Sequence, residues 1–361
     1  MASLRLGFVG AGKQAQAAHL RHYASLDDCA IGAIADLDAE LARRVATRLS
    51  PASPPPTCTT HTELIQRHRP DAIVAILPPN PAAERVICDI LDAGIPLLVE
   101  KPLAGSPAAG QRIAARAAAT ATPLTVAFHK RCDPATLAAR GEIDRLKTTG
   151  ELGKLTYARV HVALTGDWIA NGYRDTLAGS LEHRRERFPD DEFPGLDADA
   201  RKRWGIYASG YGHQLDWLRH LLDEPLAITH VEPTGVLLLV EAASGLPAVF
   251  EATPCQYTQW VEYAELFFER GRIRIDLPPP LAVNVPGRVS FFRQDDRQPT
   301  HTTPVLAYED AMRQQAEQFL AHLAGKPTPL CDAAEALESL NLATEWIRRL
   351  SEAPAAVTSM P

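Results

Sequence analysis

The sequence predicts an α/β protein in which a parallel, doubly wound sheet is followed by a region with a large, open, mostly antiparallel sheet. Over residues 1–130, short apolar runs alternate with helix-like stretches, which is the pattern of βαβ units. From Leu226 to Gln294, several β-type runs follow one another with few helical stretches between them. We therefore expect two domains, at residues 1–130 and 131–361.

The parallel sheet is expected to contain five strands. They are Leu4–Val9, Ala30–Ala35, Asp71–Leu77, Leu97–Val99 and Leu124–Phe128. The first is a continuous apolar run, as expected for a strand that is buried on both faces. Helices are expected between the strands, for example at Asp38–Leu49 and Pro81–Ala93, the second ending before Gly94. Ser50–Thr57 contains four prolines and is expected to form a surface loop.

The second region is expected to begin with a helix, Pro134–Thr148, that ends at Gly150. Lys154–Leu164 then alternates as a half-buried strand does, with Ala158, Val160, Val162 and Leu164 on one face and Tyr157, Arg159 and His161 on the other. The further β runs are Val236–Glu241, Ala248–Thr253, Val261–Glu269, Arg272–Ile275 and Arg288–Phe292. Two amphipathic helices follow, marked by Met312, Ala316, Phe319 and Leu323, and by Leu337, Leu340, Ile347 and Leu350.

Composition excludes several classes of protein. The 361 residues carry 37 Lys and Arg against 44 Asp and Glu, a net charge of −7, so a nucleic-acid partner is not expected. No apolar run reaches the ~20 residues that cross a membrane. The six cysteines form no C-x-x-C pair, which favours reduced thiols and a cytoplasmic location. We expect no metal site, because the pairs His19/His22 and His61/His68 lack nearby ligand partners and are expected on solvated helix faces.

The segment Gly10-Ala11-Gly12-Lys13-Gln14-Ala15 fits the pattern G-x-G-x-x-A. It follows a buried strand and opens a helix, which is the context in which the pattern indicates a dinucleotide site rather than a merely structural turn. Gly10 would allow the tight turn, Gly12 would let the backbone approach a pyrophosphate, and Ala15 would permit close helix packing. The pyrophosphate would lie at the helix N-terminus.

Asp36 ends the second strand and bears on which dinucleotide binds. A carboxylate at this place can accept hydrogen bonds from the ribose hydroxyls, whereas it repels a 2′-phosphate. Arg43 and Arg44 lie a helical turn further on and are expected to face solvent. The sequence therefore favours NAD(H) over NADP(H).

Glu100-Lys101-Pro102 follows the fourth strand. A lysine at the carboxyl end of a central parallel strand points into the ligand crevice of such a sheet, where it can exchange a proton with a substrate hydroxyl. The alternative is an exposed ion pair between Glu100 and Lys101.

The stretch Glu182–Trp204 holds six basic and seven acidic residues. It is expected to be either a solvated surface insertion, or a lid or subunit contact beside a site.

Taken in order, these motifs make the chain resemble the Gfo/Idh/MocA oxidoreductase family over nearly its whole length. Besides Gly10–Ala15, Asp36 and Glu100-Lys101-Pro102-Leu103, the resemblance rests on five later or intervening motifs. They are Pro78-Pro79-Asn80, Lys130-Arg131-Cys132-Asp133-Pro134, Gly150-Glu151-Leu152-Gly153-Lys154, His213-Gln214-Leu215-Asp216, and Pro327 followed by Asp332-Ala333.

The resemblance implies a Rossmann domain and a second α/β domain with an open, mostly antiparallel sheet. It also implies that Lys101 contacts the reacting hydroxyl as acid or base, and that His213 assists proton transfer. The family pattern D-x-x-x-H is broken here, because Ser209 stands at the aspartate position. Either Lys101 then does most of the proton work, or the substrate is not the usual polyol. His213 could instead be a core histidine, and Asp216 is expected to be structural.

Further site residues are expected from the same resemblance. The cofactor would contact Gly10, Ala11, Gly12, Lys13, Gln14, Asp36, Leu77, Pro78, Asn80, Glu100, Lys101 and His129. The substrate would contact Lys101, Arg131, Ser209, Tyr211 and His213. Ala83 stands where the family commonly has a histidine after Asn80.

The expected function is NAD-dependent hydride transfer to or from a secondary alcohol or ketone of a sugar, cyclitol or sugar derivative. The alternatives are an NAD-dependent glycosidase that oxidises its substrate transiently, an imine reductase, and a non-catalytic dinucleotide-binding sensor. The open sheet is expected to pair in a homodimer or homotetramer, unless its polar face is simply solvated.

Overall fold

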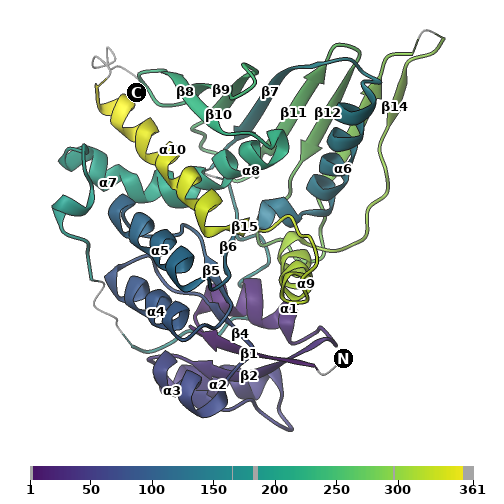
Figure 1. The fold of residues 1–361 in the computed structure, drawn as a ribbon. Coiled ribbons are helices and arrows are strands. Elements are labelled where there is room, and N and C mark those ends of the chain that lie inside the picture. The colour runs from purple at the N-terminus through teal and green to yellow at the C-terminus, as the bar shows by residue number, and fades with distance from the viewer. Residues whose placement is uncertain (1–2, 165, 182–185, 296, 353–361) are drawn as a thin grey trace. The chain divides into compact units, whose positions relative to one another are not determined.

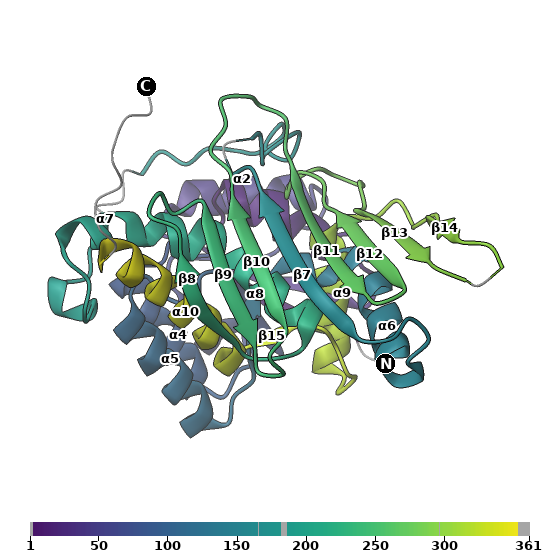
Figure 2. The same cartoon turned by 90° about the horizontal axis from the view of Figure 1, so that it is seen from above.

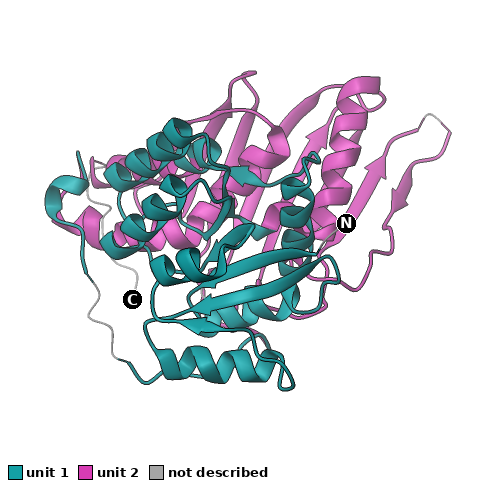
Figure 3. Ribbon diagram, turned by 60° about the horizontal axis from the view of Figure 1, so that its bottom comes forward, with its two compact units in different colours: residues 1–129, 171–194, 312–338 teal, residues 130–170, 195–311, 339–361 magenta. Residues whose placement is uncertain are grey.

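The computed structural model describes residues 3–164, 166–181, 186–295 and 297–352 (Figure 1). The chain forms two compact units, each assembled from three stretches (Figure 3). Unit 1 comprises residues 1–129, 171–194 and 312–338, and unit 2 comprises 130–170, 195–311 and 339–361. The assignment of dinucleotide binding to 1–130 and of substrate binding to 131–361 stays a prediction.

Unit 1 is built around a seven-stranded sheet with the order β15-β6-β5-β4-β1-β2-β3. The strands are β1 (Leu4–Val9), β2 (Cys29–Ala35), β3 (Thr57–Cys58), β4 (Ala72–Ala75), β5 (Leu97–Glu100), β6 (Leu124–Ala127) and β15 (Cys331–Asp332). All neighbouring pairs are parallel except β15 with β6. The five predicted parallel strands are thus confirmed, and the order reverses beside β1, as in a doubly wound sheet.

The helices of unit 1 connect these strands. They are the π-helical stretch η1 (Ala15–Leu20), α1 (Arg21–Tyr23), α2 (Ala39–Leu49), α3 (His61–His68), α4 (Pro81–Asp92), α5 (Pro107–Thr120), the short η3 (Asp190–Glu192) and α9 (Ala311–Leu323). Asp38, Thr60, Asn80 and Ser106 each accept a hydrogen bond from the backbone of the helix that they precede, which fixes where α2, α3, α4 and α5 begin.

The core of unit 1 draws on all three stretches of the chain. Leu6 and Phe8 of β1 are buried in one apolar cluster with Phe319 and Leu320 of α9, and Leu177 packs against the same cluster. The Rossmann sheet is therefore completed by residues far from it in the sequence.

Unit 2 contains an eight-stranded sheet with the order β14-β13-β12-β11-β7-β10-β9-β8 (Figure 2). The strands are β7 (Leu155–Val162), β8 (Leu226–Val231), β9 (Leu237–Ala242), β10 (Pro247–Ala252), β11 (Glu262–Phe268), β12 (Gly271–Asp276), β13 (Arg288–Arg293) and β14 (Thr300–Thr302). Among the described strands of this sheet, β7 and β10 pair in parallel and the other neighbouring pairs are antiparallel, so the sheet is mostly antiparallel, as predicted.

The helices of unit 2 are η2 (His129–Cys132), α6 (Pro134–Thr149), α7 (Ala198–Ile206), the π-helical stretch η4 (Tyr207–Tyr211), α8 (Gly212–Leu222) and α10 (Ala333–Glu352), with η2 and α10 beginning in unit 1. Helices α6, α8 and α10 contribute to an apolar cluster with one face of the sheet, in which Ala158, Val160 and Val162 are fully buried. The opposite face carries the half-buried Tyr157, Arg159 and His161, so the predicted alternation is confirmed.

Two expectations about exposure were wrong. His19 and His22 are 1% and 6% exposed rather than solvated, because the stretch that carries them packs against the unit 1 sheet. Arg43 is exposed, but Arg44 is half-buried and donates to the carbonyl oxygen of Ala178 at 3.1 Å.

Candidate functional site

The turn between β1 and η1 is shaped by Gly10. Its φ is +101°, a conformation that side chains rarely adopt, and its N–H donates to the carbonyl oxygen of Ala35 at 2.8 Å. A Cβ at Gly10 would collide with the carbonyl oxygen of Ile76. The backbone of this turn is therefore held close to two neighbouring strands.

Gly12 lies in the same turn but is not required there by packing. It is exposed, and a Cβ built on it would meet no atom of the protein within 4 Å. Lys13 is exposed and Gln14 is half-buried, while Ala11 and Ala15 are buried. The open space above Gly12, at the start of a helical stretch, fits a phosphate group that approaches the backbone closely.

Asp36 fixes this turn to the end of β2. One carboxylate oxygen accepts a hydrogen bond from the N–H of Ala11 at 2.7 Å, and the other accepts one from the N–H of Asp38 at 2.8 Å. Asp38 is buried, and hydrogen bonds from the backbone of Leu41 and Ser180 hold the pKa of its carboxyl below the usual value. The Asp36 carboxylate therefore lies beside the turn, whereas that of Asp38 caps α2.

Glu100 and Lys101 follow β5. One carboxylate oxygen of Glu100 accepts from Nε2 of His19 at 2.8 Å and from Nε2 of Gln14 at 3.3 Å, and the other accepts from the N–H of Lys101 at 3.1 Å. Burial raises the pKa of the Glu100 carboxyl, but the hydrogen bond from His19 and the positive charges of His19 and Lys101 outweigh it, so the pKa is lowered. The Lys101–Pro102 peptide bond is cis.

The second stretch of unit 1 runs along the same turn. The Tyr173 hydroxyl donates to Oε1 of Gln14 at 3.0 Å, and the side-chain amide of Gln16 bonds both the N–H and the carbonyl oxygen of Leu177, at 2.7 and 2.9 Å. The N–H of Ser180 donates to Asp38 at 2.8 Å. We call residues 171–181 the strap, because they contact the turn, η1 and the residue that caps α2.

The described part of the predicted charged stretch divides between the two units. Glu186 pairs with Arg85 at 2.8 Å, and Glu192 accepts hydrogen bonds from Arg112 and Ser106 at 2.9 Å, all within unit 1. Residues 195–204 belong to unit 2. Residues 182–185 lie outside the described part of the chain.

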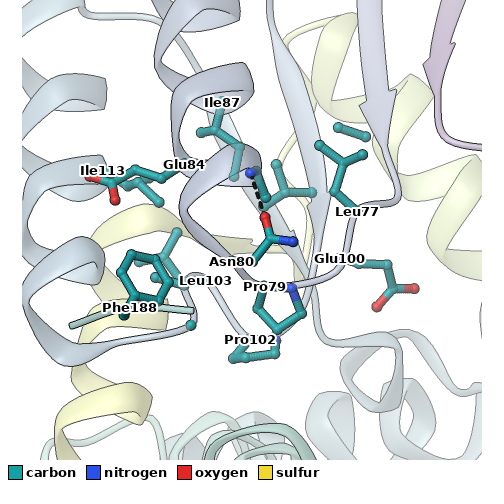
Figure 4. A pocket seen from close by; sticks show the side chains of 15 residues that line it. Leu77, Pro79, Asn80, Glu84, Ile87, Glu100, Pro102, Leu103, Ile113 and Phe188 are labelled. Carbon is teal, nitrogen blue, oxygen red and sulfur yellow. Dashed lines mark hydrogen bonds between the residues drawn. The ribbon is translucent and has the colours of Figure 1, made fainter. Parts of the chain in front are cut away.

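Several of the predicted cofactor residues surround a small pocket in unit 1 (Figure 4). Leu77, Asn80 and Glu100 line it together with Pro102 and Phe188, and its volume is about 20 Å³. That is room for about one water molecule. The Asn80 side chain accepts from the N–H of Ala83 at 2.9 Å, and the Glu100 carboxylate points away from the other lining side chains. Pro78 is exposed and His129 is buried.

The predicted residues of unit 2 cluster around the start of α8. His213 is 9% exposed in its first turn. In the π-helical stretch before it, the Ser209 hydroxyl donates to the carbonyl oxygen of Gly205. The Tyr211 ring packs against Phe250 and Trp346, with ring centroids 5.9 and 5.2 Å apart, and burial raises its pKa.

Arg131 is buried beside Asp216. Its guanidinium makes two hydrogen bonds to the Asp216 carboxylate, at 2.7 and 2.8 Å, and both side chains are at most 3% exposed. Next to it in the chain, Nζ of Lys130 pairs with Glu262 at 2.6 Å. These contacts stabilise the fold of unit 2, and a substrate-binding role for Arg131 stays a prediction.

Within the described ranges, no group of three or more His, Cys, Asp or Glu side chains is arranged to hold a metal ion. In the same ranges, no helix combines the length and the apolar character that crossing a membrane requires.

Two features of this region were missed from the sequence, namely His19 and the strap. A signal for His19 existed, since it stands in the run Ala-Ala-His-Leu, which is apolar enough to be buried. For the strap there was no local signal, because Tyr173 and Leu177 are brought to the turn by contacts 159 and 161 residues apart in the chain.

Comparisons with known proteins agree with this architecture. Residues 4–128 match the Gfo/Idh/MocA model, described as an oxidoreductase family with an NAD-binding Rossmann fold. Inositol 2-dehydrogenase 4 of Saccharopolyspora erythraea is 29% identical over 264 residues, which are 69% of this chain and 66% of that protein.

Two solved structures share the fold. One, from Desulfitobacterium hafniense and provisionally named an NADPH-dependent oxidoreductase, has a TM-score of 0.74 at 15% identity and covers 98% of this chain and 96% of its own. The other, from Sinorhizobium meliloti 1021 and provisionally named a myo-inositol dehydrogenase, has a TM-score of 0.68 at 19% identity, with 97% and 98% covered. Residues 4–128 therefore match the Gfo/Idh/MocA family of oxidoreductases, through their NAD-binding Rossmann fold.

Proposed function

We propose that this protein is an NAD-dependent dehydrogenase or reductase acting on a secondary alcohol or ketone of a sugar, cyclitol or sugar derivative. The observation that carries the proposal is the link, through the Glu100 carboxylate, between Lys101 at the end of β5 and Gln14 of the dinucleotide turn. The cyclitol class is supported by the relative named as an inositol dehydrogenase.

The residues of the turn fit a dinucleotide. The space left open at Gly12 and the start of η1 suit the pyrophosphate, and the Asp36 carboxylate suits the ribose hydroxyls. Lys13, Leu77, Pro78, Asn80 and His129 are proposed as further contacts. When bound, the nicotinamide supplies the hydride chemistry, and the protein supplies orientation and electrostatics.

Lys101 is the proposed acid or base. Its ammonium would donate a proton to the oxygen of a ketone substrate as that carbon is reduced, and the neutral amine would take the proton of a hydroxyl in the opposite direction. Its backbone is fixed by the bond of its N–H to Glu100.

His213 is proposed to assist this proton transfer, and Ser209, Tyr211 and Arg131 are proposed to contact substrate. A serine cannot hold a carboxylate charge against the imidazole as an aspartate would. The Ser209 hydroxyl also donates to the Gly205 carbonyl oxygen. We therefore assign most of the proton transfer to Lys101 rather than to His213.

We propose NAD(H) rather than NADP(H) as the cofactor. The Asp36 carboxylate lies beside the turn, bonded to the N–H of Ala11, and would repel a 2′-phosphate. NADH is expected to bind at least tenfold more tightly than NADPH by titration calorimetry. Asp36→Ser should reduce that ratio. Equal affinities in the unaltered protein would contradict the assignment.

The activity is tested by mixing the protein anaerobically with NAD⁺ and a panel of sugars, cyclitols and glycosides. Absorbance at 340 nm and product mass are recorded together. The proposal expects a rise at 340 nm that Lys101→Ala lowers by a factor of ~10²–10⁴. Lys326→Ala, which alters an exposed loop lysine, is the matched control. Glycoside cleavage without a rise would indicate a glycosidase. Tight NAD binding without any product would favour a sensor.

We also propose that the chain forms a homodimer or homotetramer through the partly exposed face of the unit 2 sheet. This face carries charges of both signs, including Arg159 bonded to Glu251 at 2.8 Å and Arg274 stacked 4.1 Å from the centre of the Tyr263 ring. Light scattering during gel filtration tests it, and a monomer at micromolar concentration would contradict it.

A further inference from the structure

The buried carboxylate of Glu100 is held from two directions. His19 and Gln14 donate to one oxygen, while the backbone of Lys101 donates to the other. The side chain of Glu100 is 9% exposed and that of His19 is 1% exposed. A carboxylate this far from water needs such donors to stay charged.

His19 reaches Glu100 from an unusual piece of backbone. Residues 15–20 form a π-helical stretch, within which the rotation per residue differs from that of an α-helix, so the directions of the later side chains change. Such stretches are rare and occur frequently at functional sites. Here the stretch buries a polar ring beside buried alanines and directs it to the Glu100 carboxylate, which also accepts a hydrogen bond from the N–H of Lys101.

We propose that His19 is a positioning residue that acts on Lys101 through Glu100. The inference rests on the proposed function of Lys101. The bond from His19 fixes the rotation of the Glu100 carboxylate, so that its other oxygen faces the Lys101 backbone. It also keeps a negative charge beside the lysine, which favours the ammonium form.

The titratable groups around Glu100 come from three parts of unit 1. They are His19 on η1, Lys101 after β5, and Tyr173 from the strap, whose hydroxyl bonds Gln14. If His19 is replaced by leucine, Glu100 loses a donor while it stays buried, so it takes up a proton more readily. A neutral Glu100 no longer stabilises the charge of Lys101, which should then lose its proton at lower pH.

The experiment measures the ionisation of Lys101 directly. The rate at which acetic anhydride acetylates Lys101 is followed against pH by mass spectrometry in the protein without substrate. In His19→Leu the midpoint is expected to fall by about one pH unit, equivalent to a tenfold change in the proton equilibrium. Glu100→Gln should shift it in the same direction, and the double variant should shift it no further than Glu100→Gln alone.

Two variants serve as controls. His61→Leu removes a second histidine–carboxylate pair, His61 with Asp89 at 2.9 Å, and should leave the midpoint unchanged. His19→Gln keeps a side-chain donor, so its midpoint should stay close to that of the unaltered protein. This variant also covers the case in which the leucine variant fails to fold. Turnover by His19→Leu should fall ~10–100-fold with KM within about threefold, as expected when a reacting group is misplaced.

An unchanged midpoint in His19→Leu, or shifts that add in the double variant, would overturn the proposal. So would a midpoint in His19→Gln as low as in His19→Leu. The acetylation measurement does not depend on catalysis. A shifted midpoint in a protein that transfers no hydride would therefore refute the proposed function and leave the positioning role standing, whereas turnover with an unshifted midpoint would do the reverse.

Discussion

Gly10 and Gly12 are glycines for different physical reasons. The backbone of Gly10 has a positive φ and lies against the Ile76 carbonyl, so any side chain there strains the protein itself. Gly12 has open space around its missing Cβ, so a side chain there would meet only a ligand. Substitutions at the two positions therefore separate the requirement of the fold, at Gly10, from that of the ligand, at Gly12.

Gly12→Val is expected to weaken NADH binding at least tenfold while changing the melting temperature by less than about 3 °C, because no protein atom is displaced. Gly10→Val should instead lower the melting temperature strongly, because a strained φ and a backbone collision combine, each of order 1–3 kcal/mol or more. Calorimetric titration measures the NADH affinity of the two variants, and thermal melts measure their melting temperatures. If the two variants lost stability equally, the space above Gly12 would not be a ligand site.

Asp133 makes the stability of unit 2 depend on pH. It caps α6 and also accepts hydrogen bonds from the N–H of Gly287, and burial raises its pKa to about 6. The folded protein therefore binds this proton more tightly than the unfolded chain, whose value is 3.8. The resulting stability is complete below pH 3.8 and is lost as the pH rises through 6.

Asp133→Asn keeps the helix cap but removes the titration. Between pH 4 and 6, the free energy of unfolding of the unaltered protein is expected to lose a contribution on the order of 2–3 kcal/mol that the variant does not lose. All five tryptophans (168, 204, 217, 260 and 346) lie in unit 2, so urea unfolding followed by tryptophan fluorescence reports on the right unit. Parallel pH profiles of the two proteins would contradict this prediction.

At the scale of elements, the strap fastens a distant part of the chain to the dinucleotide turn. The paired bonds between Gln16 and Leu177 resemble those between neighbouring strands, and Asp38 holds the strap again at Ser180. Because these contacts flank the turn, we expect the strap to slow the release of a bound dinucleotide.

Gln16→Ala should therefore raise the NADH dissociation rate ~5–10-fold, about the loss of one or two hydrogen bonds of ~1 kcal/mol each. Stopped-flow displacement by excess NAD⁺ measures the rate. Gln111→Ala, on the exposed face of α5, is the matched control. A dissociation rate that matches the control would mean that the strap only stabilises unit 1.

An element could be predicted from the sequence when the interactions that form it are local, and could not when they join residues far apart in the chain. Leu4–Val9 and the helix that ends at Gly150 are specified by local patterns, an apolar run and a terminal glycine with φ +65°. The strand Cys331–Asp332 is only two residues long and exists because it pairs with β6, so no local pattern announces it. The π-helical stretches likewise depend on what packs against them.

The candidate site divides in the same way. Gly12, Asp36 and Lys101 stand at strand ends, which the sequence locates from the apolar runs before them. The role of His19 depends on the rotation of η1 and on Glu100, 81 residues away, and neither follows from its neighbours in the chain. The apolar neighbours of His19 signal its burial, but its carboxylate partner is set by the packing of the fold.

At the scale of the molecule, unit 1 needs three separate stretches of chain. Its apolar cluster includes Ala316, Phe319 and Leu320, and removing α9 would expose the surfaces that these side chains cover. A fragment of residues 1–129 is therefore expected not to melt cooperatively and to bind a hydrophobic dye, as monitored by circular dichroism and dye fluorescence. A cooperative melt with intact NADH binding would show that the first stretch folds alone.

Because unit 1 is assembled from three stretches of chain, its folding is delayed during synthesis. The ribosome finishes translating the first stretch of unit 1 at residue 129. It must then translate residues 130–311 before α9 can pack against the Rossmann sheet. At ~5–20 residues per second this delay lasts on the order of 10–40 s. For that interval the surface awaiting Phe319 and Leu320 is open to water, to chaperones and to other nascent chains, so the yield of folded protein should depend on how fast the ribosome translates residues 130–311.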